Sequence, residues 1–144
     1  MSDLYQTIAD HLRGVCPTPA AIEPATSAAE AEAQVVGSVP IVLVIPAGER
    51  WVPVREAGLQ VTQTGLISFS CVVAMTAPGG SSEWTAVRTE LRAALLGWTP
   101  DCPEVSGPVQ ASGARLLSYS SEAGGRWLHS FDFNLPAQAT YGIK

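Results

Sequence analysis

The stretch Val39–Ile45, which reads VPIVLVI, decides the fold class because aliphatic side chains fill both faces of the strand it would form. Such a strand lies inside a sheet that is covered on both sides, or covered by a helix on one face and a partner on the other. Pro40 and Pro46 limit its length. The run is also far shorter than the roughly 18 apolar residues of a membrane span, so no membrane segment is predicted.

Outward from this run, the next segments also predict strands. Residues 46–57 are expected to form a loop, and Leu59–Thr64 and Leu66–Thr76 follow with Gly65 as a kink or bulge between them. In the second run the apolar side chains alternate and share one face, which is typical of a long strand with a core face (Ile67, Phe69, Cys71, Val73 and Met75). Further along, Val109–Tyr119 and Arg126–Leu135 predict an antiparallel pair joined by a glycine-rich turn.

Two helices are predicted from apolar side chains at helical spacing. Asp3–Arg13 carries the first stripe (Leu4, Ile8, Leu12 and, just beyond, Val15). Ser81 or Ser82 caps the second helix and Gly97 ends it, with a stripe of Trp84, Val87, Leu91, Ala94 and Leu95. A capping box formed by Ser27 and Glu30 predicts a short extra helix over Ala31–Gln34.

The order of these elements predicts an α+β fold. We expect one domain over residues 1–144, with a mostly antiparallel sheet of about four to five strands and two main helices packed on one face. Residues 16–26 are rich in proline and alanine and predict an extended arm, and residues 136–144 predict a short C-terminal tail. In an assembly such arms wrap neighbouring subunits, whereas in a monomer they fray.

The charge excludes one class of function. The chain has 144 residues and a formal net charge of −5, and residues 1–35 hold five acidic side chains against Arg13 alone. No basic patch is present, which argues against a protein that grips nucleic acid by neutralising its phosphates. An acidic surface still lets DNA pass, because repulsion keeps the DNA from adhering.

The cysteines and the N-terminus indicate the compartment. Cys16, Cys71 and Cys102 lie far apart in the sequence, so a CxxC redox or zinc motif is excluded and reduced thiols are expected. The first residues lack the positively charged segment and the following apolar stretch of a secretory signal, so no such signal is predicted. We therefore expect the chain to be made and kept in the cytoplasm.

No motif of catalysis is present: the sequence has no nucleophile elbow, phosphate loop, dinucleotide fingerprint or HExxH. His11 lies beside Asp10 on the first helix, where a solvated position is the stronger interpretation. His129 lies on an aromatic strand face and is either a ligand or pH switch, or more often a hydrogen-bonded core histidine. We therefore predict no catalytic, cofactor-binding or metal-binding residues; the alternative is a small enzyme or ligand-binding protein in which His129, Asp132 and Arg115 line a pocket.

The candidates for an interface are more informative. Trp51 stands between Arg50 and Arg55 without an obvious core face, and exposed aromatic residues flanked by arginine are typical interface anchors. The acidic N-terminal region, with Glu30 and Glu32, is the candidate for a second patch of opposite charge. Further candidates are Trp127 and Tyr141. Two different patches predict a heterologous contact between copies and hence a homo-oligomer.

The order of these motifs also carries a family resemblance. The helix exit LLGWTP at residues 95–100 and the last strand with Trp127 and Phe131 in the pattern W-x-x-x-F follow the VPIVLVIP run and the strand Phe69–Met75. This arrangement resembles the tail terminator-like proteins of long-tailed bacteriophages and prophages, the Mu-like branch especially. The resemblance covers most of the chain.

The resemblance implies a structural virion protein without catalytic residues or cofactors. Such a protein forms a hexameric ring on the head-proximal end of the tail tube, stops tube growth and offers a surface for head–tail joining. The implied partners are the tail tube protein and the head–tail connector, and genomic DNA passes through the lumen without specific binding. Two alternatives stay open: another head–tail neck adaptor, and a dimeric scaffold protein outside a phage.

Overall fold

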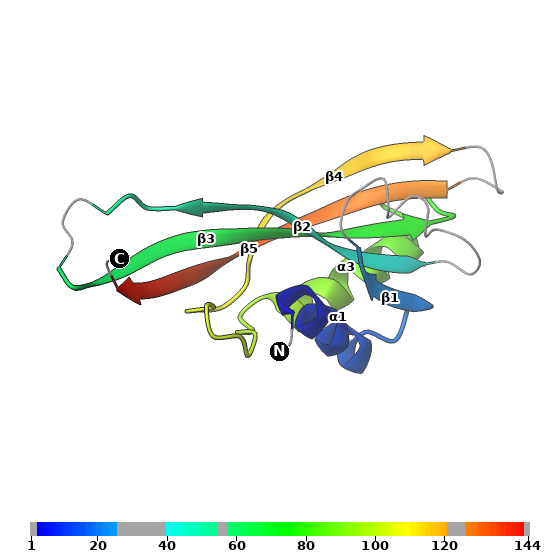
Figure 1. Cartoon of the computed structure of the whole chain (residues 1–144). Coiled ribbons are helices and arrows are strands. Elements are labelled where there is room, and N and C mark those ends of the chain that lie inside the picture. The colour runs from blue at the N-terminus through cyan, green and yellow to red at the C-terminus, as the bar shows by residue number, and fades with distance from the viewer. Residues whose placement is uncertain (1–2, 26–39, 55–57, 121–125, 143–144) are drawn as a thin grey trace.

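The computed structural model describes residues 3–25, 40–54, 58–120 and 126–142. A five-stranded sheet with the order β1-β2-β3-β5-β4 carries both helices on one face (Figure 1). Among the described strands, β1 and β2 pair in parallel and the other three pairs are antiparallel. The prediction of an α+β fold with a mostly antiparallel sheet is confirmed. The elements are α1 (Leu4–Val15), β1 (Ala21–Pro24), β2 (Ile41–Trp51), β3 (Gln60–Met75), α3 (Ser82–Leu95), β4 (Gln110–Ser120) and β5 (Arg126–Gly142).

Side-chain caps fix the start of both helices. The Asp3 carboxylate accepts a hydrogen bond from the Tyr5 N–H at 3.2 Å, and the Ser81 hydroxyl accepts one from the Trp84 N–H at 3.2 Å. At its other end, α1 is tied to β1, because the Arg13 guanidinium donates to the Ile22 carbonyl oxygen at 2.7 Å. The Ser81 cap of α3 is as predicted, whereas α1 was predicted over Asp3–Arg13 and runs over Leu4–Val15 with Asp3 as its cap.

The core lies on both faces of the sheet. On the helix-covered face, the alternating residues of β3 are buried together with the stripes of both helices (Phe69, Cys71, Val73, Met75, Ile8, Leu12, Val87 and Leu91). A second buried cluster lies on the opposite face and includes Leu43, Val72 and Leu128. Because Ile41–Ile45 is buried at every position, the two-sided strand predicted from VPIVLVI is confirmed.

Two predicted irregular segments are wrong, because strands run through them. Residues 46–51 continue β2, past an irregularity in register between Pro46 and Gly48, instead of forming a loop. Residues 136–142 continue β5 and pair with β3 instead of forming a tail. At Pro46 the neighbouring β1 has ended. At Pro136 the pairing with β4 has ended, and residues 104–106 meet this side of β5 instead, where the Ser106 N–H donates to the Pro136 carbonyl oxygen. Each proline therefore lies beyond the edge strand that flanks the rest of its own strand. Proline is tolerated where the ladder with one neighbouring strand has ended.

The predicted arm at residues 16–26 is also partly a strand. Ala21–Pro24 form β1 and pair with Ile41–Val44, so this segment closes one edge of the sheet. Proline and alanine are poor strand formers, and the tertiary contact with β2 overrides that preference. The helix predicted over Ala31–Gln34 lies outside the described residues.

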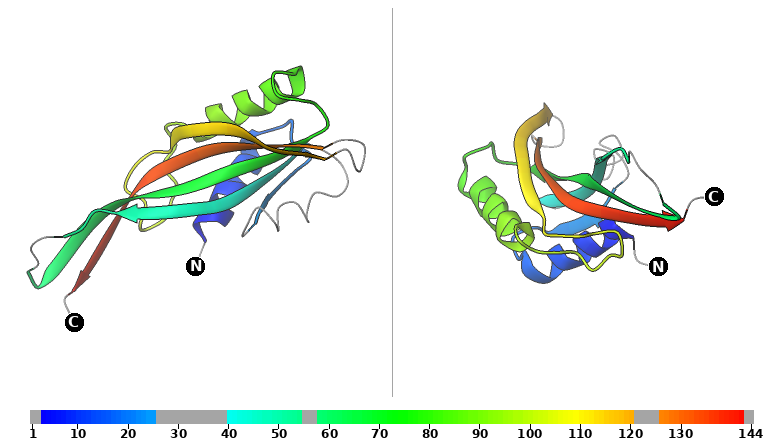
Figure 2. Two further views of the ribbon diagram at one scale, coloured as in Figure 1. Left: turned by 90° about the horizontal axis from the view of Figure 1, so that it is seen from above. Right: turned by 90° about the vertical axis from the view of Figure 1, so that its left-hand side faces the viewer.

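The long strands give the molecule an elongated shape. Residues 50–51 of β2, 60–66 of β3 and 136–142 of β5 run on beyond the helices as a three-stranded extension (Figures 1 and 2). The body of the molecule, in contrast, is the part of the sheet that α1 and α3 cover. We use the name extension for those three segments below.

Candidate interaction surfaces

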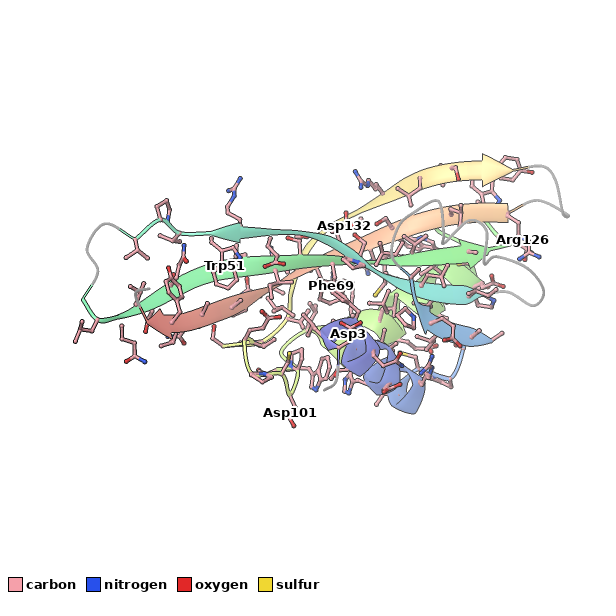
Figure 3. All side chains as sticks on the ribbon, viewed as in Figure 1. Asp3, Trp51, Phe69, Asp101, Arg126 and Asp132 are labelled. Carbon is pink, nitrogen blue, oxygen red and sulfur yellow. The ribbon has the colours of Figure 1, made fainter. Side chains whose placement is uncertain are left out.

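The extension holds three of the sequence-predicted interface residues. Trp51 is half-buried, and its indole Nε1 donates to the Glu49 carboxylate at 3.0 Å. Arg50, on the other face of β2, is exposed opposite Leu66, which is 41% exposed. On β5 the Tyr141 hydroxyl donates to the Gln63 side-chain oxygen at 3.3 Å. Figure 3 shows Trp51 on this part of the sheet, away from α1.

The remaining predicted interface residues lie elsewhere. Trp127 is half-buried at the start of β5, and its ring centroid lies 4.4 Å from that of Tyr119 on β4. It is therefore at the opposite end of β5 from Tyr141. Arg55, Glu30 and Glu32 are outside the described residues.

A hollow of about 460 Å³ lies between the start of α1, the middle of the sheet and the segment after α3. Its lining combines an apolar floor with three carboxylates at the rim (Asp3, Leu4, Tyr5, Glu49, Ile67, Cys102, Pro103 and Glu104). All three carboxylate residues are exposed. Burial, and then the negative charge of Glu49, Asp3 and Glu104, raises the pKa of the Tyr5 hydroxyl. We call this hollow the acidic pocket.

The acidic pocket is built from segments that are remote in sequence, which is why sequence reasoning missed it. Its outer wall, residues 102–104, is bonded to the sheet: the Gln138 N–H donates to the Glu104 carbonyl oxygen at 2.8 Å. The Ser106 N–H likewise donates to the Pro136 carbonyl oxygen at 3.0 Å. These bonds fix the wall against β5, so the pocket is formed in the isolated chain.

The opposite side of the sheet ends in β4, whose one strand partner in the described part of the chain is β5. Two register shifts interrupt this pairing, between Ala111 and Gly113 and between Leu116 and Ser118. Large apolar side chains are exposed along it: Leu116 is 52% and Tyr119 is 52% accessible. Exposed edges and apolar patches of this kind mark contact surfaces. We call this strand the β4 edge.

Arginines accompany the β4 edge. Arg88 and Arg92 on α3 line a hollow together with Ala111–Ala114 of β4, and Arg115 is exposed on β4 itself. The Arg88 guanidinium carbon lies 5.8 Å from the centroid of the Trp84 ring, a cation–π geometry. Arg13 on α1, in contrast, forms ion pairs with carboxylates, to Asp10 and Glu23 at 2.7 Å each. Arg115 is paired with Ser130 and so leaves the face of the sheet away from α3, while Arg88 and Arg92 lie on the α3 side. The three arginines therefore lie on both faces of the β4 edge, and we call them the basic flank.

The two histidines occupy structural positions. His11 Nε2 donates to the Ala94 carbonyl oxygen at 2.9 Å, and its ring stacks on Trp98 with centroids 3.8 Å apart. His129 is 7% exposed and lies 6.1 Å, centroid to centroid, from Trp84. Its Nε2 and the Trp84 Nε1 are buried without a hydrogen-bond partner in the described residues, and burial lowers the pKa of His129.

The alternative with a pocket of His129, Asp132 and Arg115 does not match the strand register. His129 and Asp132 are three residues apart on β5, so their side chains leave opposite faces of the sheet. The Asp132 carboxylate is occupied by the hydroxyls of Ser70 and Ser130, which donate at 2.6 Å each. Among residues 3–25, 40–54, 58–120 and 126–142, no group of three or more metal-ligating side chains is gathered.

The surfaces described above define a protein whose chain offers contacts to other proteins: an elongated strand extension, an acidic pocket and an exposed edge flanked by arginines. The family model of the phage tail terminator protein matches residues 1–138, so the chain belongs to that family. It is therefore a structural component of a phage tail and of the virion. No curated protein matches the chain. None of the described helices is long and apolar enough to cross a membrane.

Proposed function

We propose that the chain forms a hexameric ring on the head-proximal end of the tail tube, where it stops tube growth and presents the surface for head–tail joining. The ring requires a contact that joins two different patches, because a patch that pairs with its own copy closes a dimer. The observation that carries this proposal is the charge asymmetry of the body. Acidic side chains outnumber Arg13 on the α1 side (Asp3, Asp10, Glu23, Glu49, Asp101 and Glu104), whereas on the α3–β4 side the three arginines of the basic flank outnumber Glu83 and Glu90 of α3.

The extension is the proposed contact with the tube. Its strands project beyond the helices, and it exposes Arg50 and Tyr141 together with apolar side chains near its tip, of which Leu59 is 93% exposed and Val52 58% exposed. Six copies of a weak contact on a tube end of matching symmetry bind far more tightly than one. If one face of the ring matches the tube, the next tube subunit finds no site and growth stops.

The net charge supports the passage of DNA. A chain with a formal charge of −5 repels the phosphate backbone, so a ring of six copies lets genomic DNA slide through without specific binding. The partners proposed for this chain are therefore the tail tube protein and the head–tail connector. Genomic DNA passes through the lumen of the ring.

Electron microscopy of particles from a producer that lacks this chain tests the proposal. Overlong tails, together with heads that stay unjoined, are the expected result. Tails of normal length that fail to join heads would instead identify a neck adaptor that binds the connector side. Normal, joined particles would contradict both.

A further inference from the structure

We propose that neighbouring copies in the ring meet by seating the β4 edge of one copy on the acidic pocket of the next. This inference rests on the proposed function, since it names the two surfaces of the ring contact. The partner is a second copy of this chain. Two independent observations support this contact. Apolar side chains on one surface fit a hollow on the other, and the two surfaces carry opposite charges.

The first observation is that the β4 edge exposes apolar side chains of a size that fits the acidic pocket. Leu116 and Tyr119 project from the β4 edge, and each is about half exposed in the isolated chain. The acidic pocket has a floor of Leu4 and Ile67 and a volume of about 460 Å³, which is large enough for side chains of that size. A contact that places these side chains in the pocket removes apolar surface of both copies from water.

The charge complementarity surrounds this apolar centre. Arg115 and Arg88 lie on opposite faces of the β4 edge, and the carboxylates of Asp3, Glu49 and Glu104 stand at the rim of the pocket. In the described part of the chain neither arginine forms an ion pair with a carboxylate, so both are available to a neighbour. Opposite charges around an apolar centre fix the register of a contact and disfavour wrong pairings.

The two surfaces lie on different sides of the body. Viewed along the extension, α3 and β4 occupy one side of the molecule and the start of α1 lies toward the other (Figure 2, right). A contact between them is therefore heterologous and continues from copy to copy. Such a contact is suited to a ring.

The shape of the β4 edge favours side-chain docking over strand addition. The register shifts at Ala111–Gly113 and Leu116–Ser118 bend the strand, and bulges of this kind discourage a further strand from pairing. The wall of the acidic pocket, residues 102–104, is already bonded to β5 through Gln138. We therefore expect the two surfaces to meet through side chains.

A cysteine cross-link tests this contact directly. Cys102 lines the acidic pocket, and Cys16 and Cys71 are buried, so a single exchange, Leu116→Cys, places one new thiol on the β4 edge. Under mild oxidation of the assembled protein, a heterologous contact joins copies in series and yields a ladder of covalent species up to the closed ring. Two matched controls are expected to give no ladder of cross-linked species: Leu59→Cys, and the double variant Leu116→Cys with Cys102→Ser.

The possible results of the cross-linking experiment distinguish the proposed contact from its alternatives. A ladder beyond the dimer supports the proposal, and a dimer alone contradicts it because it indicates an isologous contact. Rings seen by native mass spectrometry without any ladder overturn the two surfaces and leave the proposed function standing. A chain that stays monomeric at all concentrations and does not alter tube length overturns the proposed function as well.

A charge exchange provides a second test that does not depend on a thiol. Reversal of the basic side (Arg88→Glu with Arg115→Glu) or of the acidic side (Glu49→Arg with Glu104→Arg) is expected to weaken assembly by about tenfold or more. The chain with all four substitutions restores opposite charges across the contact and is expected to regain most of the assembly. Thermal unfolding of each variant shows that it is folded. If the variant with all four substitutions is folded but assembles no better than the double variant that assembles less well, the proposed charge pairing is wrong.

Discussion

The indole of Trp51 lies directly against Gly65 of the neighbouring strand: a Cβ at position 65 would come within 2.6 Å of the ring and within 2.7 Å of the Arg50 carbonyl oxygen. Glycine is therefore required at this pair, where β2 and β3 begin to leave the body. The ring covers the backbone of the extension instead of projecting into solvent.

Gly65→Ala is predicted to displace Trp51 and to destabilise the protein by about 1–3 kcal/mol, as is typical of overpacking. Urea unfolding followed by tryptophan fluorescence measures the change. Gly14→Ala is the control, because a Cβ there meets nothing within 4 Å and alanine is the better helix former. A Gly65→Ala variant as stable as the Gly14→Ala variant would show that the close approach has no energetic role.

The contact between His11 and Trp98 joins α1 to the end of α3. Replacement by alanine at position 11 removes the hydrogen bond to the Ala94 carbonyl and the stacked ring, so a loss of about 1–3 kcal/mol is expected. Thr85→Ala, at an exposed position of α3, should change stability by less than about 0.5 kcal/mol. Chemical denaturation of both variants makes the comparison, and equal effects would assign His11 to the surface after all.

His129 predicts a dependence of stability on pH. Burial lowers its pKa in the folded chain from the ordinary value of 6.5, so the unfolded chain binds a proton more readily. The wild-type stability is therefore complete above pH 6.5 and falls as the pH drops from there toward the lowered folded-state pKa. His129→Gln removes this titration, so its unfolding free energy should fall less between pH 7.5 and pH 5; parallel curves would refute the role of His129.

The three thiols should react in an order set by burial. Burial, with a smaller effect of Glu90, raises the pKa of Cys16 to about 11, and burial raises the pKa of the fully enclosed Cys71 as well. Cys102 is half-exposed. Iodoacetamide at pH 8, followed by mass spectrometry, is expected to label Cys102 first and the other two only upon unfolding. Equal labelling of Cys71 in the native protein would contradict the burial of β3.

The body of the fold could be predicted because its signals are local. The VPIVLVI run, the alternation in β3 and the stripes of α1 and α3 each lie within a short stretch of chain. Their buried faces are those the spacing predicts, except that Val15, predicted to extend the first stripe, is 50% exposed. The extension was missed because Pro46 and Pro136 are breakers in a sequence, whereas in the sheet each lies beyond the pairing with the outer strand, β1 or β4, and still pairs with β3. Only the pairing with β3 reveals that.

The interaction surfaces were harder to predict because they depend on tertiary placement. The acidic pocket combines Asp3, Glu49 and Glu104, which are separated by dozens of residues. Trp51 was predicted as an exposed anchor from its arginine neighbours, whereas it is half-buried and bonded to Glu49. Its role in an interface stays a prediction, since that role depends on partners as well as on exposure.

The most direct measurement of the central claim is the length of tail tubes that polymerise in the presence of increasing amounts of the purified chain. Termination by a ring predicts that mean length falls as the chain is added and that every finished tube carries the protein at one end in electron micrographs. Tubes of unchanged length with unoccupied ends, at a concentration where the chain is folded and in excess, would contradict it.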